Sequence, residues 1–85
     1  MKVYVIMFTF KGYDDEYSEI VGVYDTKEKA QNKLREEMED IRFNRGYYDN
    51  DFYYDKEEEV TDNKYLAYKE YYGSELVEII EKVVE

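Results

Sequence analysis

The segment Lys2–Phe10 constrains the fold of this chain more than any other segment. Nearly every position in it is apolar or aromatic, so an extended strand would carry hydrophobic side chains on both faces. Alternation separates Val3, Val5, Met7 and Thr9 from Tyr4, Ile6, Phe8 and Phe10. A strand with two apolar faces is typical of the centre of a sheet that is covered on at least one side.

A second strand, Glu19–Tyr24, follows a polar segment that contains the turn formers Gly12, Asp14 and Asp15. A short polar connection between two apolar strands predicts an antiparallel hairpin. The two strands together would form one half of a sheet, with the next element returning across it.

A helix is predicted to begin directly after this hairpin, with Asp25 or Thr26 as its cap. Asp25 as the cap would make Glu28 its partner in a capping box. We expect the helix to end near residues 43–46 and to pack its apolar face against valines of the two strands. The helix residues are Ala30, Leu34, Met38 and Ile41, and the valines are Val3, Val5, Val21 and Val23.

The rest of the chain is less regular. Residues 44–62 follow neither a helical nor a strand period and predict a long loop with at most one helical turn. Residues 63–72 and 75–85 fit either a helix or a strand, and the turn signal Gly73-Ser74 between them favours a second hairpin. The expected fold is α+β: a single domain over residues 1–85, with an antiparallel sheet of about four strands (β-β-α-β-β) and one helix on one face.

The composition excludes several kinds of chemistry. The chain has 22 acidic and 12 basic residues, a formal net charge of −10, and neither cysteine nor histidine. Disulfides, the usual zinc and haem sites and histidine-activated nucleophiles are therefore impossible. The segment from Asp49 begins like a calcium loop, but Tyr54 and Val60 occupy the positions of the required glycine and glutamate. We expect no enzymatic activity, no metal and no cofactor.

The charge also predicts the kind of partner. A body of this charge repels phosphates and anionic lipids, so we expect no direct contact with nucleic acid or with a membrane. No apolar run is long enough to span a membrane, and the N-terminal segment alternates as a strand does, unlike a signal peptide. The expected location is therefore the cytoplasm. The surfaces that such a protein attracts are basic, and most proteins with basic surfaces bind nucleic acid.

The segment 44–62 concentrates this charge, with seven acids against two bases, and interleaves it with aromatic residues. Aromatic side chains beside carboxylates suit arginine and lysine, through cation–π contacts and charge-assisted hydrogen bonds. We therefore predict the partner-binding site in this segment. Its residues are Tyr47, Tyr48, Asp49, Asp51, Phe52, Tyr53, Tyr54, Asp55, Glu57, Glu58 and Glu59.

The first half of the chain resembles a group of short uncharacterised proteins from phages and Gram-positive bacteria. The resemblance lies in Lys2-Val3-Tyr4-Val5, in Val21-Gly22-Val23-Tyr24 and in Thr26-Lys27-Glu28-Lys29-Ala30. It implies a hairpin followed by a capped helix, and a phage or mobile-element origin. In size and charge the chain is also similar to phage counter-defence inhibitors, including anti-CRISPR and other DNA-mimic proteins.

These observations lead to two function hypotheses. The first is a phage-type inhibitor that binds a basic, nucleic-acid-binding surface of a host protein, as an anti-CRISPR or other counter-defence DNA mimic in the host cytoplasm. The second is a non-catalytic interaction module that forms a homodimer through its sheet edge or a tyrosine-rich face. Salt dependence separates them, because binding to a basic protein weakens as salt screens the charges.

Overall fold

The structure is a computed structural model that describes residues 1–12, 14–45, 47–48, 51–52, 56–69 and 73–84. For 43–45, 47–48, 51–52, 56 and 69 it describes the backbone alone. The elements in chain order are β1 (Lys2–Gly12), β2 (Glu16–Tyr24), α1 (Lys27–Glu39), the π-helical turn η1 (Asp40–Arg45), β3 (Tyr47–Tyr48), β4 (Asp51–Phe52), β5 (Lys56–Val60), β6 (Lys64–Lys69) and β7 (Gly73–Val83).

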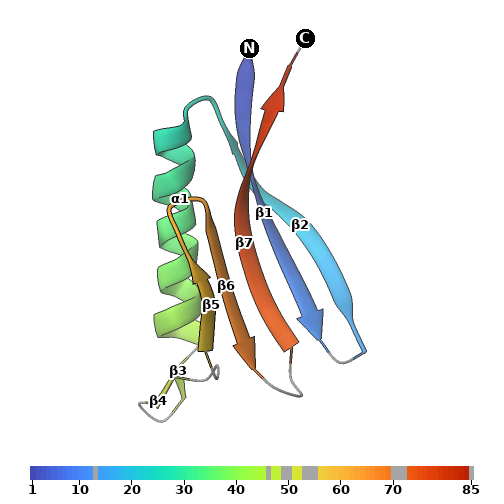
Figure 1. Ribbon diagram of the computed structural model, residues 1–85, viewed down its shortest axis with the longest axis vertical. Helices are drawn as coiled ribbons and strands as arrows, with labels where there is room; N and C mark the ends of the chain where they lie inside the picture. The colour runs from blue at the N-terminus through green and yellow to red at the C-terminus, as the bar shows by residue number, and fades with distance from the viewer. Residues whose placement is uncertain (13, 46, 49–50, 53–55, 70–72, 85) are drawn as a thin grey trace.

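The fold is α+β, with an antiparallel sheet and α1 on one side of it (Figure 1). The sheet has five strands in the order β2-β1-β7-β6-β5, and β3 and β4 form a separate two-stranded sheet. The prediction of a helix on an antiparallel sheet is confirmed, but the number of about four strands is too low. The second hairpin, β6 with β7, is also as predicted, although Gly73 and Ser74 belong to β7 and form no turn.

The strand that the sequence did not predict is β5, which lies inside the expected loop 44–62. It pairs with β6, and a bulge between Glu57 and Glu59 interrupts the register. The bulge shifts the alternation of side chains within five residues, three of which are glutamates, so no strand period is visible. β3 and β4 fall in the same expected loop.

Helix α1 begins at Thr26, whose hydroxyl accepts a hydrogen bond of 3.2 Å from the backbone N–H of Lys29. Thr26 and not Asp25 is therefore the cap, which places Glu28 one position too early for the predicted capping box. Asp25 instead accepts a hydrogen bond from the Lys29 side chain at 2.9 Å. The helix ends at Glu39 and continues as η1, which carries Ile41 into the core.

The helix packs on the face of the sheet opposite to the one predicted. Ala30, Leu34 and Ile41 are buried as expected, and Met38 packs at their margin. Their partners, however, are Ile6, Phe8, Tyr65, Ala67 and Val77, with Val21 at the edge. Val23 lies on the other face of the sheet and is 57% exposed. Val3 and Val5 lie on that face as well, because Val5 is opposite Val23 and side chains alternate along β1. The expected packing against Val3, Val5 and Val23 is thus wrong.

Neighbouring strands explain why this face is the buried one. In register, Phe8 lies opposite Val77, and Val77 lies opposite Tyr65, so three strands place large side chains in one row beneath α1. The alternation of β1 could not distinguish its faces because both are apolar. No helix in the described part of the chain is both long and apolar enough to cross a membrane.

Candidate functional site

The structure places the predicted binding residues that it describes in two groups. Tyr47 and Tyr48 in β3 pair with Phe52 and Asp51 in β4. Glu57, Glu58 and Glu59 lie on β5, an edge strand of the main sheet. The other predicted residues, Asp49, Tyr53, Tyr54 and Asp55, lie outside the described residues.

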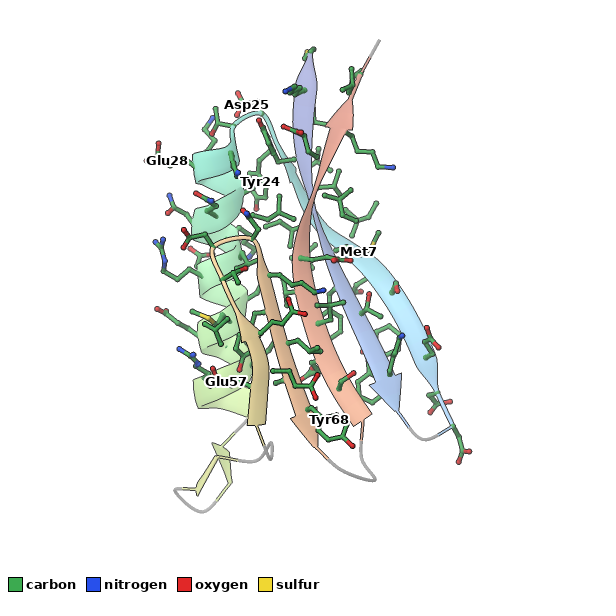
Figure 2. The ribbon with its side chains drawn as sticks, in the orientation of Figure 1. Met7, Tyr24, Asp25, Glu28, Glu57 and Tyr68 are labelled. Atoms are coloured by element: carbon green, nitrogen blue, oxygen red, sulfur yellow. The ribbon has the colours of Figure 1, made fainter. Side chains whose placement is uncertain are left out.

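Glu57 is partly buried and is held by an ion pair within the protein (Figure 2). The Nε of Arg42 donates to its Oε1 at 2.8 Å, and the Nη2 of Arg42 donates to Oε2. The guanidinium carbon also lies 5.5 Å from the ring centroid of Tyr65. The hydrogen bond with Glu57 raises the pKa of Arg42. Glu57 therefore ties β5 to the end of the helix, which is a structural role.

The two remaining glutamates of β5 are exposed. Glu59 forms an ion pair of 3.4 Å with Lys64 on the neighbouring strand. Glu58 sits at the bulge, between the paired positions of β5 and β6. Glu57 and Glu59 thus each have a basic partner within the chain, and a basic partner protein would have to compete with that internal partner.

Tyr65 is fully buried beside this ion pair, and its hydroxyl has no hydrogen-bond partner among the described residues. Burial, together with the negative charge of Glu57, raises the pKa of Tyr65 from 10.0 to about 12. Arg42 acts in the opposite direction and lowers it. The native state consequently holds the Tyr65 proton more tightly than the unfolded chain does.

We expect this difference to weaken the fold in alkaline solution. Between pH 10 and about 12 the unfolded chain loses the Tyr65 proton while the native state keeps it, so unfolding becomes more favourable as the pH rises. The loss is at most roughly 3 kcal/mol, because one pKa unit corresponds to about 1.4 kcal/mol. Urea denaturation of the wild type and of Tyr65→Phe across this range measures it.

The Tyr65→Phe variant isolates this contribution from the other groups that titrate in the same range. At neutral pH we expect it to be as stable as the wild type or more so, because it removes an unsatisfied buried hydroxyl. Above pH 10 its stability should fall less steeply. Parallel pH profiles for the two proteins would contradict the prediction.

A different group of acids has no such partner among the described residues. The acidic tip, as we name it, comprises four exposed carboxylates at the end of the β1–β2 hairpin. They are Asp14, Asp15, Glu16 and Glu19. The turn is closed by the backbone N–H of Gly12, which donates to the carbonyl of Asp15 at 2.6 Å. In Figure 1 this end of the hairpin projects away from α1.

The carboxylates of the acidic tip differ from several other described acids, which form ion pairs within the chain. Asp25 pairs with Lys29, Glu37 with Lys33, and Glu81 with Lys2. No ion pair or side-chain hydrogen bond joins the four tip carboxylates to any residue that the structure describes. Their charge is therefore available to a partner, and the base nearest to them in sequence is Lys11.

An exposed aromatic residue lies within the acidic tip. Tyr17 is 54% exposed, and its ring centroid lies 5.6 Å from that of Phe10 and 6.1 Å from that of Phe8. Tyr17 and Glu19 are two residues apart on β2, so they project from the same face of the sheet. An arginine of a partner could lie on the Tyr17 ring and reach the Glu19 carboxylate.

The sequence contained a signal for this surface that the prediction did not use. Five acids and no base occur between Lys11 and Lys27. The acidic excess in segment 44–62 is larger and is the more prominent of the two in the sequence. Only the paired strands show that the tip lies at the free edge of the sheet and that Glu57 is sequestered.

The described surface offers little room for a small molecule. The hollow between α1 and β5, lined by Leu34, Met38 and Val60, has a volume of about 150 Å³, and a more open one beside Tyr24 has about 260 Å³. Small-molecule sites are usually about 300 to 1,000 Å³. Among the described residues, no cluster of three or more acidic side chains is arranged to hold a metal ion.

Comparison with protein families gives one match. The model of a domain of unknown function, DUF7336, matches residues 1–69, which is most of the chain. The chain belongs to the DUF7336 family. The match ends before β7, the strand that pairs with both β1 and β6 in this DUF7336 sheet. No curated protein and no solved structure matches the chain.

Proposed function

We propose that this DUF7336 protein is a non-catalytic inhibitor that binds a basic, nucleic-acid-binding surface of a second protein. The observation that carries the proposal is the acidic tip, where four exposed carboxylates form no ion pair with a described residue and lie close in sequence to the exposed Tyr17. The phage origin and the counter-defence role, including action on a CRISPR effector, are part of this proposal and follow from the resemblance of the sequence.

The chemistry of the tip supports competition with nucleic acid. Duplex DNA presents one negative charge per about 1.7 Å of its axis, and proteins read it with lysine and arginine. A row of free carboxylates can occupy the same side chains, while an aromatic ring gives a desolvated contact that slows dissociation. Acids on an exposed edge strand also have a simpler role, since they prevent pairing with other edges. Displacement of DNA distinguishes the two roles, because acids that mimic nucleic acid must displace it and acids that only protect a sheet edge need not.

The segment 47–59 remains a second part of the proposed surface. Glu58 and Glu59 are exposed on β5, at the opposite edge of the sheet from the acidic tip. Glu57 should be left unchanged in binding experiments because its loss would disrupt the pair with Arg42.

The test is displacement of DNA from its binding proteins. Each of a panel of bacterial nucleic-acid-binding proteins, beginning with a guide-loaded RNA-guided nuclease, is bound to a fluorescent DNA duplex and titrated with the acidic protein. We expect displacement that is competitive with DNA and weaker at higher salt. Neutralising the four tip acids (D14N, D15N, E16Q and E19Q) should weaken displacement at least tenfold.

A matched control removes the same number of charges elsewhere on the surface. Its substitutions, at exposed acids of α1 and of the β5–β6 loop, are E28Q, E36Q, E39Q and D62N. We expect this control to retain most of the displacement. An equal loss in both variants would show that net charge and not the tip is responsible, and no displacement across the panel would contradict the proposed mimicry.

A further inference from the structure

The face of the main sheet turned away from α1 is not covered by any described part of the chain; we call it the open face. In register, Val23, Val5 and Ile80 lie opposite one another across β2, β1 and β7. Ile20 and Met7 form the next row, and Met7 points away from α1 in Figure 2. Ile20 is 60% exposed and Val23 is 57% exposed. Contiguous exposed apolar surface of this kind marks an interaction site.

The charges on the open face identify the kind of partner that it fits. Its described side chains include three bases and three acids, although the chain as a whole carries −10. Lys64 lies opposite Glu78, and Lys11 lies opposite Glu16. The third base is Lys82 and the third acid is Glu59. A second copy of the chain could approach this face without meeting the excess negative charge present elsewhere.

The size of the open face is also adequate for a homodimer. Strands lie about 4.8 Å apart and rise about 3.3 Å per residue, so five strands of six residues cover roughly 500 Å² in projection. Side chains that stand out from the sheet increase the accessible area, which approaches the roughly 800 Å² per partner of a standard interface. In a dimer with twofold symmetry, the same surface of both copies forms the interface, and two open faces packed together meet this condition.

We propose that the protein forms a symmetric homodimer in which the open faces of two sheets pack against each other. The arrangement is a sandwich with helices on its two outer sides, and it buries Met7 together with Ile20 and Val23 of the edge strand β2. The proposal does not depend on the proposed function, since three of the four tip acids, Asp14, Asp15 and Glu19, stay outside the packed faces and only Glu16 lies on the open face.

Sedimentation equilibrium of the wild type and of two matched variants tests the dimer. Ile20→Asp places a charge on the open face, while Val60→Asp places one on the helix side of the other edge strand, where the wild-type residue is 50% exposed. We expect a wild-type dimer, a dissociation constant at least tenfold higher for Ile20→Asp, and a change of less than threefold for Val60→Asp. Circular dichroism and thermal melts confirm that both variants are folded.

Salt distinguishes this association from binding to a basic protein. Screening weakens repulsion between two bodies of like charge, so the dimer should tighten as salt rises, whereas displacement of DNA should weaken. A wild type that sediments as a monomer at every accessible concentration would overturn the proposal. A dimer that both variants weaken equally would place the interface elsewhere and overturn it as well.

Discussion

Replacing Leu34 by alanine should lower the free energy of unfolding by about 2 to 5 kcal/mol. Leu34 is 2% exposed and lies in a cluster with Ile6, Tyr65 and Val77, so truncation leaves a cavity beneath α1. In so small a protein the loss is a large part of the total stability. Urea denaturation followed by circular dichroism measures it.

Val83→Ala is the control for this substitution. Val83 is 69% exposed near the end of β7, and truncation there should change the free energy of unfolding by no more than about 0.5 kcal/mol. If Leu34→Ala and Val83→Ala lowered stability by similar amounts, the assignment of the buried helix face would be incorrect.

Replacing Gly73 by alanine should destabilise the protein by at least about 2 kcal/mol. Gly73 begins β7 with a φ of 135°, a conformation that residues with a Cβ rarely adopt. An added Cβ would lie 1.9 Å from the carbonyl oxygen of Lys11 and 2.8 Å from the Cα of Gly12. Both contacts are with backbone atoms, so relief requires β1 and β7 to separate at this end.

Gly22 offers a matched control within the same sheet. The three atoms nearest to an added Cβ at Gly22 all belong to the Tyr24 side chain, the nearest at 2.8 Å, and a side chain can move aside. We expect Gly22→Ala to cost clearly less than Gly73→Ala in urea denaturation. Hydrogen exchange should show faster opening of the β1–β7 pairing in Gly73→Ala alone. Equal costs for the two variants would refute the argument from backbone contact.

Several elements of the fold were predictable from local patterns. The apolar alternation of Lys2–Phe10 predicted β1, and the spacing of Ala30, Leu34 and Ile41 predicted the buried face of α1. Both patterns arise because side chains of one face recur with the period of the element. The charge excess of the sequence likewise indicates a basic partner, and that remains a prediction.

Other features depended on contacts between distant segments. The sequence of β5 has no strand period, and its pairing with β6 places Glu57 against Arg42 at the end of the helix. The sequence marked Glu57 as one of many acids available to a partner. The ion pair with Arg42 makes Glu57 unavailable to a partner. It joins residues fifteen positions apart, and no local sequence pattern around either residue indicates it.

The sequence by itself determined that β1 has two apolar faces, that α1 has one, and that the chain is strongly acidic. The tertiary structure alone decided which face of β1 the helix covers, because Val77 and Tyr65 from other strands complete the row around Phe8. It also decided that Val23 and Ile20 stay exposed and that the carboxylates of the acidic tip form no ion pair with a described residue. A local pattern records which side chains share a face, whereas burial and charge pairing depend on what the folded chain brings opposite that face.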